Sequence, residues 1–250
     1  KRQFPWRGTN DPWKILLIET LSQQTQLERA NKYYEKFLVK FPSPKSMSSA
    51  SLKIILKMWS GLGYNNRAIR LHEASKIIEK QGFNRIYPNF DVLPGVGPYT
   101  KNAILSFAYG EKVLAVDSNI ERIIQRYFGI NDTKDFFKEN SMHLLHKVNS
   151  RDINQAFMDF GSSICKSLNP LCNTCPIEKK CQKYFSNNKS SNEKFKGSNR
   201  EIRGKIIKLL IEKNSIDDQK LFEEIYEDSE KVKKALRGLE KDNLIKFKKN

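Results

Sequence analysis

The stretch Leu93-Pro94-Gly95-Val96-Gly97-Pro98-Tyr99-Thr100 decides the fold, because it places a tight turn inside residues 91–107, whose apolar spacing is helical. Two glycines two positions apart let the backbone turn sharply without a Cβ clash. They also let successive N–H groups point outward where the next helix begins, and such a helix N-terminus suits a phosphate. A contact of this kind holds a duplex in place without reading its sequence. Any tight turn between helices can be rich in glycine, so a purely structural turn remains the alternative.

Most of the chain has the apolar spacing of helices, and no sustained alternation of period two predicts a sheet before residue 186. Asp11-Pro12 is a good helix start, with a capping side chain followed by proline in the first turn. We therefore predict an all-α fold. The predicted helices are residues 11–21, 28–41, 52–59, 68–78, 91–107, 118–127, 135–148 and 153–165.

The C-terminal part is set apart by a polar segment of low complexity, residues 186–192, which predicts a linker. Beyond it, residues 200–213, 217–226 and 229–241 predict three short helices, and residues 244–247 predict a short strand. Three helices and a terminal strand are typical of a small winged-helix-like module. A helical cap or dimerisation element is an equal alternative.

The charge of the chain points to a polyanionic partner. Lys and Arg number 45 against 28 Asp and Glu, a formal net charge of +17, which favours nucleic acid, or less often an anionic membrane, over a merely solvated surface. The excess is spread out: residues 194–250 hold 16 basic and 11 acidic residues, and the preceding residues hold 29 and 17. Both parts are therefore expected to contact phosphates.

No apolar run approaches membrane-spanning length, and the segment from Lys1 to Trp6 lacks the core of a signal peptide. We expect a soluble, monomeric protein in the cytoplasm, associated with the nucleoid and with no membrane partner. Because the chain does not begin with Met, residues are expected to precede Lys1.

All four cysteines lie within 17 residues, with the spacing C-x6-C-x2-C-x5-C: Cys165, Cys172, Cys175 and Cys181. Four cysteines in one short loop would staple little of a 250-residue chain, so a metal site is the better explanation. Zinc sites usually have two C-x2-C pairs, and this loop has one. Four thiolates without histidine favour a [4Fe–4S] cluster, with zinc as the alternative.

Together these motifs resemble the helix-hairpin-helix DNA glycosylases. The octapeptide resembles the hairpin of that family, and the cysteines resemble, one for one, the cluster loop of endonuclease III and MutY glycosylases. Within the superfamily, Glu19 followed by Gln23-Gln24-Thr25 resembles the MutY adenine glycosylases, as do Arg7 and Tyr64. The resemblance covers about residues 4–185.

The resemblance implies two catalytic carboxylates. Asp117, in Val116-Asp117-Ser118-Asn119, falls at the position of the family's catalytic aspartate, although capping the helix from Ser118 would explain it equally well from spacing. Glu19 would be the acid that protonates adenine at N7. Its neighbours Leu16, Leu17, Ile18 and Leu21 would raise its pKa by burial. The alternative is a structural pairing of a buried Glu19 with an arginine.

Other residues match family positions with distinct roles. Tyr99 and Asn119 would orient Asp117 and the departing base, and Arg7 and Gln155 would contact the flipped adenine. Bifunctional relatives carry lysine in place of Tyr99, so base removal without efficient strand cleavage is expected. Tyr64 would be the wedge that fills the gap, with an ordinary core aromatic as the alternative. Gln24, Thr25 and Leu62 would face the opposite base, which in this family is 8-oxoguanine. Gln23 is a further expected DNA contact, and Gly95 and Gly97 would lie at the phosphates.

The resemblance also implies a division of the chain. Residues 8–116 would form a six-helix barrel with the hairpin, and residues 1–7 with 117–185 would form the cluster subdomain. Residues 186–199 would be the linker and 200–250 the basic tail, where family members usually have a Nudix-like domain. Two alternatives remain: a thymine or uracil mismatch glycosylase, which Gln23-Gln24-Thr25 disfavours, and a non-catalytic iron–sulfur DNA-binding protein.

Overall fold

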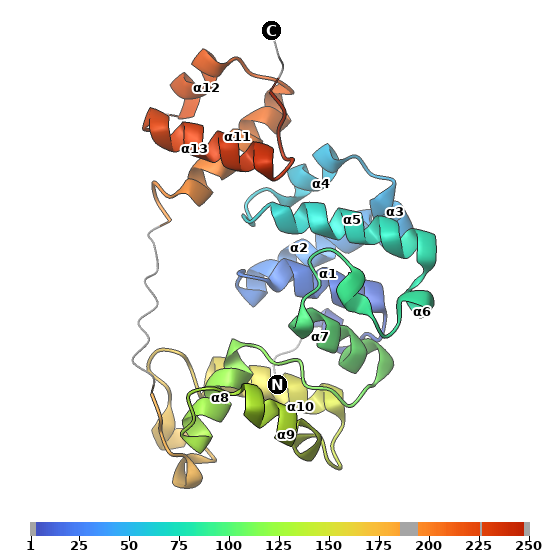
Figure 1. Cartoon of the computed structure of the whole chain (residues 1–250), viewed down its shortest axis with the longest axis vertical. Coiled ribbons are helices and arrows are strands. Elements are labelled where there is room, and N and C mark those ends of the chain that lie inside the picture. The colour runs from blue at the N-terminus through green and yellow to red at the C-terminus, as the bar shows by residue number, and fades with distance from the viewer. Residues whose placement is uncertain (1–3, 186–194, 226, 248–250) are drawn as a thin grey trace. The chain divides into compact units, whose positions relative to one another are not determined.

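The computed structural model describes residues 4–185, 195–225 and 227–247, and these residues form helices and no β-strand (Figure 1). The chain divides into two compact units. One contains Lys1–Thr20 and Gly82–Lys189, and the other contains Leu21–Gln81 and Ser190–Asn250. Within the described part of the chain, no helix has the length and apolar character needed to cross a membrane. The all-α prediction is confirmed.

The first unit carries the hairpin and the cysteine loop. Helix α10 packs against α8 and α7, and the core between them includes Ile104, Ala115 and Ile120. Its elements are η1 (Pro5–Gly8), most of α1 (Pro12–Ser22), α6 (Phe83–Ile86), η2 (Phe90–Val92), α7 (Pro98–Tyr109), α8 (Ser118–Phe128), α9 (Lys134–Leu144), α10 (Ser150–Ser163), η3 (Cys172–Thr174) and η4 (Glu178–Lys180).

The second unit begins with four helices: α2 (Leu27–Lys40), α3 (Pro44–Ser48), α4 (Leu52–Trp59) and α5 (Asn66–Gln81). Helices α3 and α4 both pack against α5. Phe37 is fully buried and meets Trp59 edge-on, with ring centroids 5.7 Å apart. These aromatic side chains hold α2 and α4 together.

The C-terminal residues add α11 (Asn199–Lys213), α12 (Asp218–Ile225) and α13 (Ser229–Lys241) to the second unit. They surround a core of their own, centred on Ile206, Val232 and Leu239, and α11 also packs against α4. The predicted strand at residues 244–247 is wrong. No partner strand exists among the described residues, and Leu244 and Ile245 instead pack on the helical core. The winged-helix resemblance therefore depends on the three helices alone.

Most predicted helices are confirmed, and the differences have local causes. Residues 91–107 are not one helix, because a 3-10 turn and the hairpin precede Pro98. Helix α3 was not predicted because Pro42-Ser43-Pro44 looks like a break. In fact Ser43 caps the new helix and Pro44 occupies its first turn, where a missing N–H costs nothing. The predicted linker segment 186–192 lies outside the described residues, and the subdomain boundaries remain a prediction.

Candidate active site and cysteine cavity

Glu19 occupies the third turn of α1, which Asp11 caps by accepting a 2.9 Å hydrogen bond from the Trp13 amide. Only 6% of Glu19 is exposed, and the adjoining Leu16, Leu17 and Ile18 are buried as well. Burial raises the pKa of Glu19 from 4.5 to about 7, a hydrogen bond from Tyr99 lowers it, and the charge of Asp117 raises it. A large fraction of Glu19 is therefore protonated at neutral pH, the direction expected from its apolar neighbours.

Tyr99 reaches Glu19 from the hairpin. Its hydroxyl donates a 2.7 Å hydrogen bond to Oε2 of Glu19. Burial, and then the charge of Glu19, raise the pKa of Tyr99 well above 10.0, so the hydroxyl remains a donor. Gly95 has a φ of +83°, which favours glycine, and Tyr99 follows it as the second residue of α7. Gly97 is extended (φ −94°), a conformation open to any residue, so the turn itself does not require this second glycine.

Asp117 is the N-cap of α8. Its Oδ1 accepts hydrogen bonds from the backbone amides of Asn119 at 3.0 Å and Ile120 at 2.9 Å. Its Oδ2 accepts a 2.7 Å hydrogen bond from the side-chain amide of Asn119. Asp117 also lies near enough to raise the pKa of both Glu19 and Tyr99. The capping role given as the alternative for Asp117 is thus confirmed.

Arg7, Glu19 and Gln155 line one small cavity, with a volume of about 10 Å³, which is about the space of one water. Both terminal nitrogens of Arg7 donate to Asp159, at 2.8 and 2.6 Å. The Gln155 amide donates to the backbone carbonyl of Arg7 at 3.3 Å. The structure therefore places the predicted base-pocket residues beside Glu19. A base that contacts Arg7 would do so while Arg7 is also paired with Asp159. Tyr99 and Asp117 do not line this cavity.

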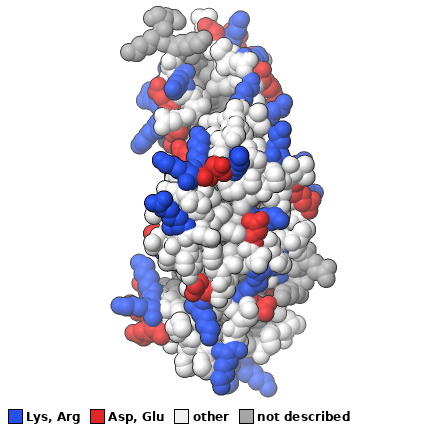
Figure 2. Space-filling model, turned by 90° about the vertical axis from the view of Figure 1, so that its right-hand side faces the viewer, with Lys and Arg blue, Asp and Glu red and all other residues white. Residues whose placement is uncertain are grey.

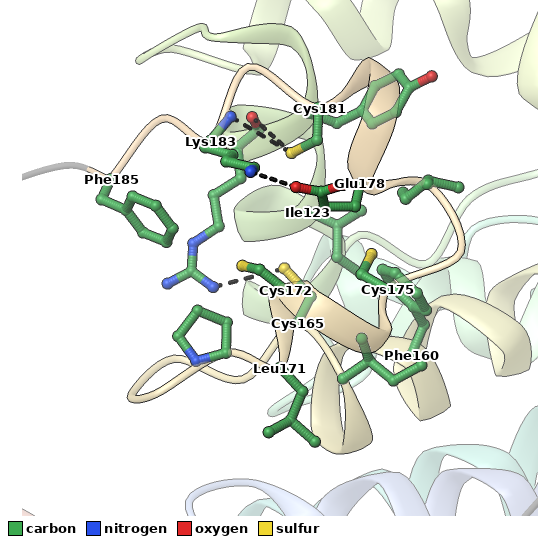
Figure 3. Close-up of a pocket in the computed structure, with 15 residues that line it drawn as sticks. Ile123, Phe160, Cys165, Leu171, Cys172, Cys175, Glu178, Cys181, Lys183 and Phe185 are labelled. Atoms are coloured by element: carbon green, nitrogen blue, oxygen red, sulfur yellow. Dashed lines mark hydrogen bonds and ion pairs between the residues drawn. The ribbon is translucent and has the colours of Figure 1, made fainter.

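The four cysteines line a second cavity in the same unit, and Figure 3 shows their sulfur atoms around one hollow. Arg126, a buried residue, donates from Nη1 to Sγ of Cys165 at 3.5 Å, and the Lys183 amide donates to Sγ of Cys181 at 3.4 Å. Donors of positive or partial positive charge stabilise thiolates. The residues in place thus have the chemistry of a thiolate ligand set.

A single metal ion would require the sulfur atoms to lie close together. Around a single tetrahedral zinc, with bonds of about 2.3 Å, sulfur atoms lie about 4 Å apart. In the described part of the chain, no three Cys, His, Asp or Glu side chains are placed to hold one metal ion. The four cysteines therefore line one cavity without forming a site for a single metal ion among the described residues.

Comparison with known proteins agrees with this geometry. Residues 18–147 match the model of the HhH-GPD superfamily of base excision DNA repair proteins. The chain belongs to this superfamily. The predicted resemblance to its MutY branch is confirmed by proteins named adenine DNA glycosylase. The protein of that name from Buchnera aphidicola subsp. Baizongia pistaciae is 36% identical over 195 residues, which are 75% of this chain and 55% of that protein. The chain spans about half the length of the curated relatives it matches.

Solved structures are also similar to this chain. A thermostable thymine-DNA glycosylase has a TM-score of 0.67 and 34% identity, covering 73% of this chain and 88% of that one. Endonuclease III in a non-covalent complex with DNA has a TM-score of 0.61 and 23% identity, over 69% of this chain and 83% of that one, and this likeness shows the fold alone.

Arg122 is a residue of the site that the sequence analysis did not identify. Its Nη2 donates to Oδ1 of Asn119 at 2.8 Å and to the carbonyl of Gly161 at 2.8 Å. Its Nε donates to the backbone carbonyl of Cys165 at 2.9 Å. Arg122 therefore connects the cysteine loop to the amide that bonds to Asp117. A Cβ on Gly161 would lie 2.5 Å from Cβ of Asn119, so glycine is required for this approach.

The predicted opposite-base residues lie in the second unit, in two loops held by another unpredicted residue, Arg67. Nη1 of Arg67 donates to the carbonyl of Gln23, and Nη2 donates to Oγ1 of Thr25 at 3.3 Å and to the carbonyls of Leu62 at 3.3 Å and Gly63 at 3.0 Å. Burial lowers the pKa of Arg67 to about 10, so it remains charged. One guanidinium thus joins the loop containing Gln24 to the loop containing Tyr64.

Proposed function

We propose that the protein is a DNA glycosylase that removes adenine from duplex DNA, where it is mispaired with 8-oxoguanine or guanine. One observation carries this proposal: a glutamate with a pKa of about 7 is buried beside a tyrosine donor and an aspartate. An acid of this strength protonates a leaving group near neutral pH. Relatives from several organisms, named adenine DNA glycosylase, support adenine as the base.

In the proposed reaction, Glu19 gives its proton to N7 of adenine. The bond between the base and C1′ then breaks, its electron pair leaves with adenine, and an oxocarbenium-like sugar remains. Asp117, held by the N–H groups of Asn119 and Ile120, stabilises this cation or bonds to it transiently. Water then adds to C1′ and its proton returns to a carboxylate, so the two carboxyl groups divide the work as in retaining glycosidases.

Adenine must leave the base stack to reach Glu19. Arg7 and Gln155 line the cavity beside Glu19 and would contact the flipped base. Since this cavity has room for about one water, we propose that the pocket opens when adenine enters. Tyr64 would fill the gap in the duplex, Gln23, Gln24, Thr25 and Leu62 would face the opposite base, and the turn at Gly95 and Gly97 would approach a phosphate.

The proposed enzyme removes the base without efficient strand cleavage. A lyase reaction requires an amine that forms a Schiff base with the sugar. The residue that bonds to Glu19 at the start of α7 is Tyr99, whose hydroxyl is a donor and not an amine. Strand breaks should therefore appear after hot alkali only, and Tyr99→Lys tests whether an amine at this position introduces cleavage.

We further propose that Cys165, Cys172, Cys175 and Cys181 hold a [4Fe–4S] cluster. The support is their arrangement around one hollow and the N–H donors directed at two of their sulfur atoms. A bound cluster would supply a rigid cross-link within the loop of residues 165–181. Thiolate ligation of this kind is kept in reducing surroundings, which agrees with a protein that acts inside the cell.

A second candidate is a thymine or uracil glycosylase acting opposite guanine, favoured by the 34% identity to the thymine-DNA glycosylase. Duplexes carrying A opposite 8-oxoguanine, A opposite G, T opposite G and U opposite G distinguish the two. Excision of adenine supports the first proposal, and excision of thymine or uracil alone supports the second. Binding without any excision would indicate a non-catalytic protein. Glu19→Gln should abolish adenine excision while leaving DNA binding largely intact.

A further inference from the structure

The second unit contains a groove that joins the Tyr64 loop, already proposed to contact DNA, to helix α11, which has no role in the proposed reaction. One wall is the loop that carries Tyr64, together with Gln23 and Gln24, and the other wall is helix α11 of the C-terminal module. Its volume is about 1080 Å³, and its lining includes seven Lys and Arg residues against two acidic ones. Such an excess of positive charge is the footprint of a polyanion-binding surface.

Arg200, at the start of α11, makes the central contact across this groove. Its Nη1 donates a 2.7 Å hydrogen bond to the hydroxyl of Tyr64. Its guanidinium lies 5.1 Å from the ring centroid of Tyr64 and 4.9 Å from that of Phe195. Tyr64 keeps 42% of its surface exposed and Phe195 keeps 56%. Two exposed aromatic rings beside a cation are the arrangement on which unpaired bases stack.

Helix α11 is also held at its other end and along its length. Lys53, near the start of α4, donates to Oδ1 of Asn214, which follows α11. The apolar side chains of Leu56 from α4 and of Ile207 and Ile211 from α11 line the groove. These contacts fix α11 as a wall of the groove, with its basic residues Arg203, Lys205 and Lys208 among the lining.

The geometry points to this groove, formed by α11 and the Tyr64 loop, as a binding surface for duplex DNA in which Arg200 holds Tyr64 in position. Cations distributed along the groove suit the repeating charge of a phosphate backbone. The exposed rings of Tyr64 and Phe195 suit contact with the base that is left unpaired when adenine leaves the stack. On the face drawn in Figure 2, Lys and Arg are more frequent than Asp and Glu, in agreement with a polyanionic partner. The inference depends on the proposed function in that the ligand is DNA.

The test measures the affinity for an undamaged fluorescent duplex at several salt concentrations. Removing one phosphate contact should reduce the slope of log affinity against log salt by about one. We expect this for Arg200→Ala, because one hydrogen bond to Tyr64 leaves other guanidinium N–H groups for a phosphate. We expect the same for Lys208→Ala, and a reduction of about two for the double variant. Lys208 is exposed, and among the described residues no hydrogen bond joins it to Tyr64. Its replacement therefore tests the groove even if Arg200→Ala perturbs the loop. Circular dichroism checks that each variant is folded.

The matched control is Arg237→Ala, which removes the same charge from the exposed face of α13, outside the groove. It should keep the wild-type slope. Groove variants that behave like Arg237→Ala would overturn the inference. So would single-stranded RNA of equal length competing as well as unlabelled duplex.

The same variants separate this inference from the proposed function. A wild-type protein that excises no adenine, but whose salt slope falls in both groove variants and not in the control, would sink the proposed enzyme and support the groove. Adenine excision with unchanged salt slopes in both groove variants would support the proposed enzyme and overturn the groove.

Discussion

Replacing the buried carboxyl group of Glu19 should change how the stability of the protein depends on pH. The pKa of Glu19 is raised from 4.5 to about 7, chiefly by burial, so the folded chain holds this proton more tightly than the unfolded chain. The stability that the group contributes is therefore fully present below about pH 4.5 and is lost as the pH rises through 7. At about 1.4 kcal/mol per pKa unit, the loss reaches roughly 3 kcal/mol by pH 8 and is about 1 kcal/mol at pH 5.

Glu19→Gln keeps the shape of the side chain and removes its titration. Relative to this variant, the wild type should thus lose about 2 kcal/mol or somewhat more of its unfolding free energy between pH 5 and pH 8. Urea unfolding followed by far-UV circular dichroism at each pH measures the difference. Glu139→Gln, at an exposed position on α9, is the matched control. Its unfolding free energy should differ from that of the wild type by the same amount at pH 5 and pH 8. If the unfolding free energies of the wild type and Glu19→Gln differ by the same amount at pH 5 and pH 8, the raised pKa of Glu19 is refuted.

The remaining predictions concern Tyr99, Gly161 and Cys175. Tyr99→Phe removes the hydrogen bond that lowers the pKa of Glu19, so the pH at which excision declines should move upward; a pH–rate profile that stays in place would contradict this. Gly161→Ala places a Cβ 2.5 Å from Cβ of Asn119 and should cost about 1–3 kcal/mol of stability and slow excision. Thermal melting and single-turnover rates check it, and unchanged values for both would be evidence against the packing. Cys175→Ser should reduce the iron content and visible absorption of the purified protein, and full retention of both would remove Cys175 as a ligand.

The sequence predicted those features that depend on local chemistry. Residues 52–59 and 229–241 form helices with the predicted bounds, because their apolar periodicity and flanking caps agree. The run from Leu16 to Ile18 indicated that Glu19 would be buried, and its raised pKa follows from that burial. The cysteine spacing placed four thiols in one loop, and they line one cavity.

What the sequence did not predict depends on contacts between distant segments. Arg67, Arg122 and Arg126 all donate to backbone carbonyls far along the chain, and nothing in their sequence neighbourhood marks those carbonyls. The pairing of Arg7 with Asp159 is likewise a contact over 152 residues. The missing strand at 244–247 has a related cause, since a strand requires a partner that only tertiary structure supplies.

The most direct measurement is the single-turnover rate of adenine release, from a duplex with A opposite 8-oxoguanine, as a function of pH. If Glu19 donates the proton, the rate should fall above about pH 7 and approach a tenfold loss for each further unit, because only the protonated acid is active. A rate that remains constant or rises from pH 7 to pH 9 would contradict a proton held by Glu19.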